Sequence, residues 1–168
     1  YALYGDISNR VMSIIRDSWP DIEIYSIDEA FLDLKGLSES QQNAFCEKLR
    51  WRILKNVGIP TSIGIGRTKT QAKLANHLAK KIIKTPVVNL SEQASQLKSV
   101  AVCDVWGVGR RWSKKLIECG IRTAADLAQM NPHYIKAHFN ITLMNTAMEL
   151  AGTACAKLNV PEKKKSII

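Results

Sequence analysis

The sequence predicts an α+β segment over about the first 90 residues, followed by an all-α segment. Three observations lead to this prediction: runs with strand character occur only before residue 90, helical periodicity takes over after Leu90, and glycine or proline separates the helical runs. With 168 residues and 46% hydrophobic content, the chain can bury a core as one domain or two small ones. We find no internal repeat.

The first 90 residues are expected to alternate helices with short strands. A helix over Ser8–Arg16 precedes a hairpin from Ile22 to Leu34, in which side chains alternate between two faces. A helix over 39–57 follows, with apolar residues at four-residue spacing. The next strand covers Thr61–Ile65, and Val87-Val88 is expected to be a short edge strand.

The rest of the chain is expected to consist of short helices. Gly120 and Gly152 end two of them, and Asn131-Pro132 breaks the series. The expected helices are 91–98, 102–106, 110–119, 124–130, 133–138 and 141–151.

Asp28 and Glu29 stand side by side within the apolar hairpin segment. Adjacent carboxylates repel each other and lose hydration in such a setting, so a compensating cation is expected. A tight hairpin would present both at its tip, where oxygen ligands can hold Mg²⁺ and leave positions open for substrate phosphates. An ordinary acidic turn is the alternative.

Charge is distributed unevenly along the chain. Residues 1–47 carry three Lys/Arg and nine Asp/Glu, a net −6, whereas residues 48–168 carry 21 and six, a net +15, which gives the overall +9. An acidic region that could bind metal is thus followed by a basic region suited to polyanions. Nucleic acid is the leading partner.

The four cysteines do not have the spacing of a zinc site, and the three histidines add no ligand pattern. No stretch is apolar enough to span a membrane, and the first residues lack the pattern of a signal peptide. We therefore expect a cytoplasmic protein with reduced thiols at Cys46, Cys103, Cys119 and Cys155.

The segment 67–84 contains six basic residues and no acidic one. Small and apolar residues recur there at helical spacing as far as Ile82, which indicates an amphipathic helix beginning near Thr68. Such a face can bind DNA or a nucleotide, or it can be an ordinary solvated surface. Its basic residues are Arg67, Lys69, Lys73, Lys80, Lys81 and Lys84.

A second basic cluster follows a Gly-Val-Gly sequence. The glycines permit a tight turn, and free N–H groups at the start of the next helix can bind a phosphate without reading base sequence. The pattern is typical of a helix-hairpin-helix, which occurs in polymerases, repair nucleases, glycosylases and ligases alike; a packed turn with glycine caps is the alternative. The residues concerned are Gly107, Val108, Gly109, Arg110, Arg111 and Lys114.

Longer stretches around these motifs resemble the Y-family DNA polymerases, which copy damaged templates. The similarity is to the UmuC branch, which includes the catalytic subunit of bacterial DNA polymerase V, and it extends from residue 3 to about 155. It is carried by Ser26–Phe31, Gly64–Gly66, Ala72–His77 and Asp104–Arg111, among other runs. Ala101 and Cys103 depart from the family pattern, which leaves the entry to the first thumb helix open.

The resemblance implies three regions. Residues 1–90 would be part of a polymerase palm with an antiparallel or mixed sheet, residues 91–155 a thumb with the helix-hairpin-helix, and residues 156–168 a basic linker towards a little-finger domain. Family members also have a first palm strand carrying another metal-binding aspartate, and fingers, none of which precedes Tyr1. We expect a fragment that is inactive by itself.

The resemblance also implies roles for individual residues. Asp28 would help to bridge two Mg²⁺ ions, and Glu29 would bind the metal that activates the primer 3′-hydroxyl. Lys80 would reach the triphosphate of the incoming nucleotide. Arg67, Lys69 and Lys73 would lie near the DNA, as would the Gly-Val-Gly cluster.

By the same resemblance, the full-length protein would perform template-directed nucleotidyl transfer past DNA damage in the SOS response. Its partners would be primer-template DNA, dNTPs, a UmuD′-like accessory dimer, RecA and the sliding clamp, at the nucleoid and not at a membrane. Two other functions stay open: a non-catalytic DNA-holding module, or a helical protein-protein scaffold whose acidic pair is only structural.

Overall fold

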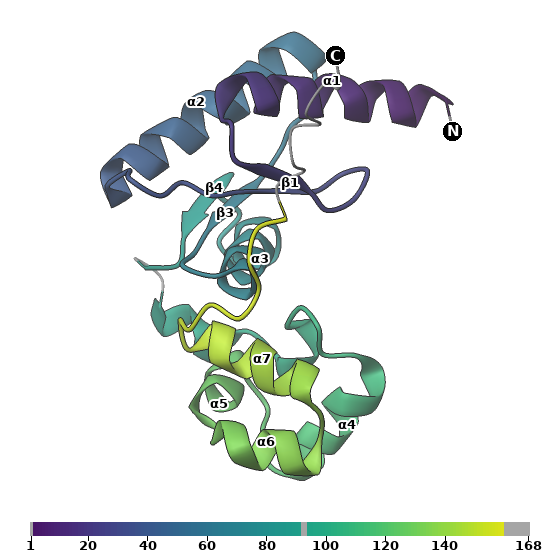
Figure 1. The fold of residues 1–168 in the computed structure, drawn as a ribbon, viewed down its shortest axis with the longest axis vertical. Helices are drawn as coiled ribbons and strands as arrows, with labels where there is room; N and C mark the ends of the chain where they lie inside the picture. Colours follow the sequence, from purple (N-terminus) through teal and green to yellow (C-terminus); the bar gives the residue numbers. More distant parts are fainter. Residues whose placement is uncertain (1, 92–93, 160–168) are drawn as a thin grey trace, which may run out of the picture. The chain divides into compact units, whose positions relative to one another are not determined.

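The structure is a computed structural model that describes residues 2–91 and 94–159 (Figure 1). The described residues pack into two compact units, one formed by residues 2–61 with 157–159 and the other by residues 62–156. The α+β class is confirmed: among the described residues, strands and helices alternate before residue 90, and the elements after it are helical. The division into palm and thumb near residue 90 concerns polymerase domains and stays a prediction.

In the first unit, α1 (Ala2–Ser18) and α2 (Glu39–Val57) lie side by side (Figure 1). The expected helix over Ser8–Arg16 was too short, because α1 begins six residues earlier. An ion pair of 2.9 Å between Asp6 and Arg10 supports these first turns at i,i+4 spacing. Asp6 therefore lies within the helix and not at its start.

The predicted helix over 39–57 is confirmed at both ends. The Ser38 hydroxyl accepts a hydrogen bond from the Gln41 N–H, and the Gln41 side chain accepts one from the Ser38 N–H, which forms a capping box. Gly58 ends the helix in the left-handed conformation, with φ of 78°, and its N–H donates to the Leu54 carbonyl.

The hairpin is formed by β1 (Ile22–Ile24) and β2 (Ala30–Leu32), which pair antiparallel with Glu23 opposite Phe31. The expected alternation of faces is not followed, because Ile22 and Glu23 are both buried. The Glu23 carboxylate accepts a 2.5 Å hydrogen bond from the backbone N–H of Asn159, within the same unit. This contact accounts for a buried acid in the strand.

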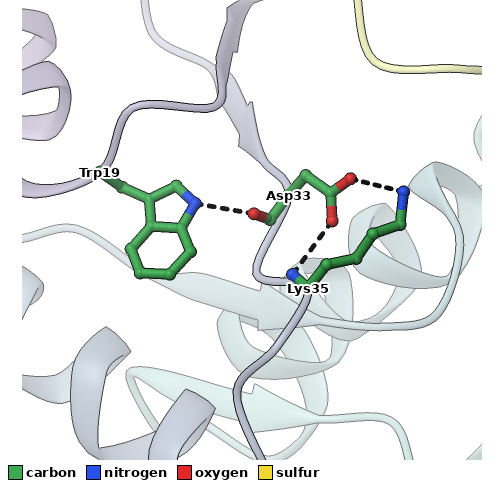
Figure 2. Close-up of polar contacts among 3 residues, drawn as sticks. All are labelled: Trp19, Asp33 and Lys35. Atoms are coloured by element: carbon green, nitrogen blue, oxygen red, sulfur yellow. Dashed lines mark hydrogen bonds and ion pairs between the residues drawn. The ribbon is translucent and has the colours of Figure 1, made fainter.

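Polar contacts fix the base of the hairpin (Figure 2). The Trp19 indole N–H donates to the Asp33 carbonyl at 2.7 Å, and its ring lies 5.2 Å from that of Phe45 on α2. The Asp33 carboxylate accepts from the Lys35 N–H at 3.1 Å and pairs with its ammonium at 2.8 Å. The hairpin is thus attached to the residue after α1 and, through Phe45, to α2.

In the second unit, β3 (Ile63–Ile65) pairs in parallel with β4 (Val87–Asn89). The four described strands therefore form two separate two-stranded sheets, one antiparallel and one parallel. Between β3 and β4 lie α3 (Lys69–His77) and η1 (Leu78–Ile82), a π-helical turn. Thr68 caps α3 by accepting from the Gln71 N–H, so the predicted start near Thr68 is confirmed.

Ile82 does not continue the packed face of this helix, because it is 39% exposed. The π turn shifts the residues after His77 around the axis relative to a regular α-helix, which a 3.6-residue pattern does not anticipate.

The helices after residue 109 follow the prediction closely. They are α4 (Arg110–Glu118), α5 (Ala124–Gln129), α6 (Pro132–His138) and α7 (Ile141–Leu150).

The two helices expected before them were wrong in type. In the part of the chain that the structure describes, η2 (Ala94–Ser99) and η3 (Val102–Asp104) are 3₁₀ turns. The Val102 N–H donates to the Arg122 carbonyl, and the Ala124 N–H donates to the Val100 carbonyl. These two hydrogen bonds hold the backbone between η2 and η3 extended. Residues 92–93 of the expected helix over 91–98 lie outside the described residues. So does the part of the expected basic linker beyond residue 159.

One core runs through the second unit. It joins Leu74 and Leu78 of α3 and η1 and Val88 of β4 to buried side chains of the later helices, among them Leu116 and Leu143. The parallel strand pair and the helical region therefore share one hydrophobic core. Each of the four cysteines is free, and burial raises the pKa of the Cys46 thiol to about 12.

A buried carboxylate on α7 connects distant parts of this unit. Glu149 is 3% exposed, and one of its oxygens accepts from the hydroxyl of Thr70 at 2.6 Å and from its N–H at 3.0 Å. The other accepts from the N–H groups of Cys155 at 3.2 Å and Ala156 at 2.8 Å. Burial opposes ionisation, but these hydrogen bonds outweigh it and hold the pKa of Glu149 below its ordinary value of 4.5.

Glu149→Gln is expected to lower the free energy of unfolding at pH 7 by about 1–3 kcal/mol, because an amide cannot accept at both ends. A lowered folded-state pKa stabilises the protein above pH 4.5, and this contribution is lost as the pH falls through the folded-state pKa. Urea unfolding at pH 7 and about pH 3 should show the difference between variant and wild type shrinking at the lower pH. Glu118→Gln, on the exposed side of α4, is the control; an equal loss for Glu149→Gln at both pH values would contradict the argument.

Candidate metal and nucleic-acid sites

The carboxylate pair lies at the tip of the hairpin, as the sequence predicts. The N–H groups of Tyr25 and Ser26 both donate to the Glu29 carbonyl, at 3.0 and 3.1 Å, which closes the turn. The Ser8 hydroxyl on α1 donates to the Ile27 carbonyl and so anchors the turn to that helix. The backbone on both sides of Asp28 is therefore held by hydrogen bonds.

Asp28 is exposed, whereas Glu29 is half-buried. One oxygen of Asp28 accepts a hydrogen bond of 2.7 Å from the Ser26 hydroxyl, which limits the side-chain rotamers. Exposure lets this carboxylate exchange water for a cation without the cost of burying a charge. The arrangement suits a hard cation that keeps several waters and substrate phosphates among its ligands.

A complete metal-ligand cluster is not present in the described part of the chain. No group of three His, Cys, Asp or Glu side chains there could hold an ion. Asp6 is paired with Arg10 on α1, so it is engaged elsewhere. Asp28 and Glu29 fit such a site as two of its oxygen ligands.

Lys80 lies in the second unit, on η1, and is exposed. The carboxylate pair belongs to the first unit, so no single unit contains both the predicted catalytic carboxylates and the predicted nucleotide-binding lysine. π-Helical turns are rare and frequently occur at functional sites. Lys84, just beyond this turn, has φ of 56°, a left-handed conformation that lysine rarely adopts.

The basic residues of α3 approach the Gly-Val-Gly segment. The Lys73 ammonium lies 5.9 Å from the centroid of the Trp106 ring, which directly precedes Gly107. Lys69 and Lys73 are half-buried, and Arg67 is exposed just before the helix. The structure thus brings two of the predicted DNA-binding clusters together within the second unit.

The two glycines of the hairpin have different roles. Gly107 adopts φ of 87°, and a Cβ there would lie 3.0 Å from the Thr146 hydroxyl, so this position requires glycine. Gly109 has φ of −75° and begins α4 without a side-chain cap. Val108 between them is buried. In the described chain, the element directly before this turn is the three-residue 3₁₀ turn η3 and not an α-helix, so the first helix of a helix-hairpin-helix is not confirmed.

A shallow hollow lies at the start of α4 and combines cations with an apolar floor. Its polar lining includes Arg110, Ser113, Lys114 and the carboxylate of Glu118, and Val108 and Ile117 line its apolar part. The predicted residues Arg110 and Lys114 therefore share one surface, next to the unoccupied N–H groups expected of a helix N-terminus.

Lys115 has a structural role that the sequence did not reveal. Its ammonium donates to the His138 carbonyl at the end of α6, at 2.6 Å, and lies 4.8 Å from the Phe139 ring centroid. Trp112 packs against Phe139 with centroids 5.7 Å apart, and Arg111 lies 5.2 Å from the Trp112 ring. In the sequence, only the three-residue spacing between Trp112 and Lys115 indicated this role, because residues at i and i+3 are neighbours on a helix.

Comparison with known proteins gives a consistent result. Residues 1–77 match the family model described as impB/mucB/samB family. The chain is 43% identical over 175 residues to Protein UmuC of Salmonella typhimurium, covering 99% of this chain and 42% of that protein. It is 37% identical to Protein MucB of Escherichia coli, covering 100% and 42%, and 34% identical to DNA polymerase IV of Moorella thermoacetica, covering 75% and 32%. The chain thus spans less than half the length of these relatives.

Solved structures share the fold. The insertion ternary complex of Dbh DNA polymerase superposes with a TM-score of 0.73 at 24% identity, over 89% of this chain and 44% of that one. DinB from Sulfolobus solfataricus gives a TM-score of 0.69 at 24% identity, over 89% and 45%. None of the described helices is both long and apolar enough to cross a bilayer.

Proposed function

Because this chain belongs to the impB/mucB/samB family of Y-family DNA polymerases, we propose that it works in an error-prone translesion DNA polymerase. The reaction is template-directed nucleotidyl transfer past damaged bases. The observation that carries the proposal is the carboxylate pair held at the tip of the hairpin, exposed at Asp28. Relatives named DNA polymerase IV support the reaction class.

In this proposal Asp28 and Glu29 supply oxygen ligands to a two-Mg²⁺ site that needs a further carboxylate. Bound ions neutralise phosphate charge and lower the pKa of the attacking hydroxyl. Asp28, the more exposed of the two, would help to hold both ions, and Glu29 would help to hold the one that activates the primer 3′-hydroxyl. The Ser26 hydroxyl holds Asp28 in place for this role.

Lys80 is proposed to bind the triphosphate of the incoming dNTP. Its exposure on η1 leaves a flexible ammonium that can follow phosphate charge as it develops.

Primer-template DNA is proposed to bind along the second unit without sequence preference. Arg67, Lys69 and Lys73 contribute from the α3 side. Gly107, Val108 and Gly109 form the turn, and Arg110, Arg111 and Lys114 supply cations from α4, as one half of a helix-hairpin-helix. The contact between Lys73 and Trp106 supports a single continuous surface. Sequence-independent phosphate contact is what an enzyme moving along any template requires.

Adjacent lysines on α4 offer a sharp test of this surface. Lys114→Met should reduce the slope of log K against log salt for duplex binding by about 0.9, because one phosphate contact is lost. Lys115→Met should leave that slope unchanged and lower the melting temperature instead, because Lys115 is bound to α6. Salt titrations by fluorescence anisotropy and thermal unfolding measure the two effects. Equal slopes for Lys114→Met and wild type would contradict the proposed contact.

A DNA-holding module without catalysis is the second candidate. It is favoured by one observation: the proposed duplex-binding residues all belong to the second unit, whereas the carboxylate pair belongs to the first. Primer extension separates the two candidates, since a holding module binds duplex but adds no nucleotide to it.

The wider setting is part of the same proposal. We place residues 1–90 in the palm, 91–155 in the thumb and 156–168 in a linker, in an SOS-response enzyme of the cytoplasm and nucleoid. Partners of the same proposal are a UmuD′-like dimer, RecA and the sliding clamp. Support comes from the similarity to Protein UmuC and Protein MucB.

A further inference from the structure

The outer face of α2 carries a row of cations around an exposed indole. Lys48, Trp51, Arg52 and Lys55 occupy positions i, i+3, i+4 and i+7, which lie on one side of a helix, and all four are exposed. The opposite side of α2 packs into the first unit through Cys46, Leu49 and Ile53. We call the four exposed residues the α2 face.

The stability of α2 explains only part of this row. Basic residues in the last turns interact favourably with the helix dipole, which accounts for Lys55 in particular. It does not account for Trp51, which leaves 59% of its surface in water. A single exposed aromatic is common, but one between three cations is a specific combination.

The cations of the α2 face are available for a ligand. Arg50, beside them, already pairs with Glu47 at 3.4 Å, and its guanidinium lies 4.9 Å from the Trp51 ring. In the described part of the chain, no carboxylate lies within ion-pair distance of Lys48, Arg52 or Lys55. Arg52 donates to the Ser18 hydroxyl at 2.8 Å, which holds it against the end of α1.

The chemistry of this face matches single-stranded nucleic acid. Lysine and arginine contact phosphates, and an exposed indole offers a surface on which an unpaired base can stack. Paired bases cannot reach it in this way, and lysine is depleted in protein-protein interfaces. The capping box at Ser38 and the glycine cap at Gly58 make α2 a rigid platform, so little conformational entropy is lost on binding.

We propose that the α2 face is a second nucleic-acid site, which binds single-stranded DNA or RNA without sequence preference. Trp51 stacks on a base, and Lys48, Arg52 and Lys55 contact phosphates. The site lies in the first unit, whereas the proposed duplex-binding residues lie in the second. It does not depend on polymerase activity.

The test uses a fluorescein-labelled oligothymidylate and the chain with Arg110→Ala and Arg111→Ala, which weakens the other proposed site. In that background Trp51→Ala should weaken binding about tenfold, within the range for loss of one stacked base. Lys48→Gln with Lys55→Gln should reduce the log-log salt slope by about 1.4, at about 0.7 for each contact with a single strand. Trp51→Phe should retain most of the affinity, because it keeps an aromatic face.

Matched controls are Tyr4→Ala, an exposed aromatic on α1, and Lys98→Gln with Lys136→Gln, two exposed lysines of the other unit. They should bind the oligonucleotide as the background does. An oligonucleotide carrying 5-iodouracil should photocrosslink to Trp51, which mass spectrometry of the tryptic peptides would show. Unchanged affinity in Trp51→Ala, or crosslinks confined to residues 106–118, would overturn the proposal.

Competition identifies the class of ligand. Poly-L-glutamate with the same charge as the oligonucleotide should displace it poorly, because it offers no base to stack. Equal displacement would overturn the assignment to nucleic acid in favour of an acidic protein. Loss of duplex binding through Lys114 is measured separately, so failure of the polymerase proposal and failure of this one give different results.

Discussion

Asp28→Asn is expected to reduce primer extension at least about 10³-fold in a full-length polymerase that carries this chain, since a metal ligand is lost at the reacting centre. The amide keeps nearly the same shape, and its oxygen can still accept the hydrogen bond from Ser26. Asp28 is exposed, so folding should not change. Affinity for primer-template DNA should stay within about twofold, because the proposed phosphate contacts lie on other elements.

Asp21→Asn is the matched control for this variant. Asp21 is an exposed carboxylate of the same hairpin, at the end away from the tip, and extension should proceed at the wild-type rate. Single-nucleotide incorporation on undamaged and lesion-containing templates measures the rate, and anisotropy measures binding. Near-normal extension by Asp28→Asn would sink the assignment of this residue as a metal ligand.

Gly64→Ala is expected to destabilise the second unit by about 3 kcal/mol or more, since the added Cβ would overlap backbone atoms and not a flexible side chain. A Cβ on Gly64 would lie 2.2 Å from the carbonyl oxygen of Ala72 and 2.2 Å from the nitrogen of Asn76. Both are backbone atoms of α3, so relief requires moving the helix away from β3. The helix also belongs to the common core through Leu74.

Thermal unfolding should show this as a fall in melting temperature of roughly 6–12 °C, at about 2–4 °C for each kcal/mol in a chain of this size. Gly5→Ala is the control with the opposite sign. Nothing lies within 4 Å of a Cβ at Gly5, which is inside α1, so alanine should raise stability by about 0.5–1 kcal/mol. A melting temperature of Gly64→Ala within 2 °C of wild type would show that α3 can move away from β3.

Local signals explain why most elements could be predicted. Ser38 with Gln41 and Gly58 mark both ends of α2, and Thr68 marks the start of α3. These residues act through hydrogen bonds to their own neighbours, so their effect is present in the sequence itself. The end of α3 was less predictable, because the change to a π turn after His77 leaves no local signature.

Other features arise only from contacts between distant residues. The 3₁₀ turns before α4 result from backbone pairing of residues 100–102 with residues 122–124. The difference between Lys114 and Lys115 depends on where the end of α6 lies. Glu149 was not singled out, because its four hydrogen-bond donors lie up to 79 positions away.

By itself the sequence determined the class of the fold, the family and the placement of Asp28 and Glu29 at a hairpin tip, because each depends on local periodicity or on motifs of adjacent residues. Tertiary structure decided which basic residues are available to a ligand and which hold the fold. It also decided that Gly64 must be glycine and that the strands form two sheets. These are decided by burial and by hydrogen bonds across the fold, where free energy depends on which distant groups meet.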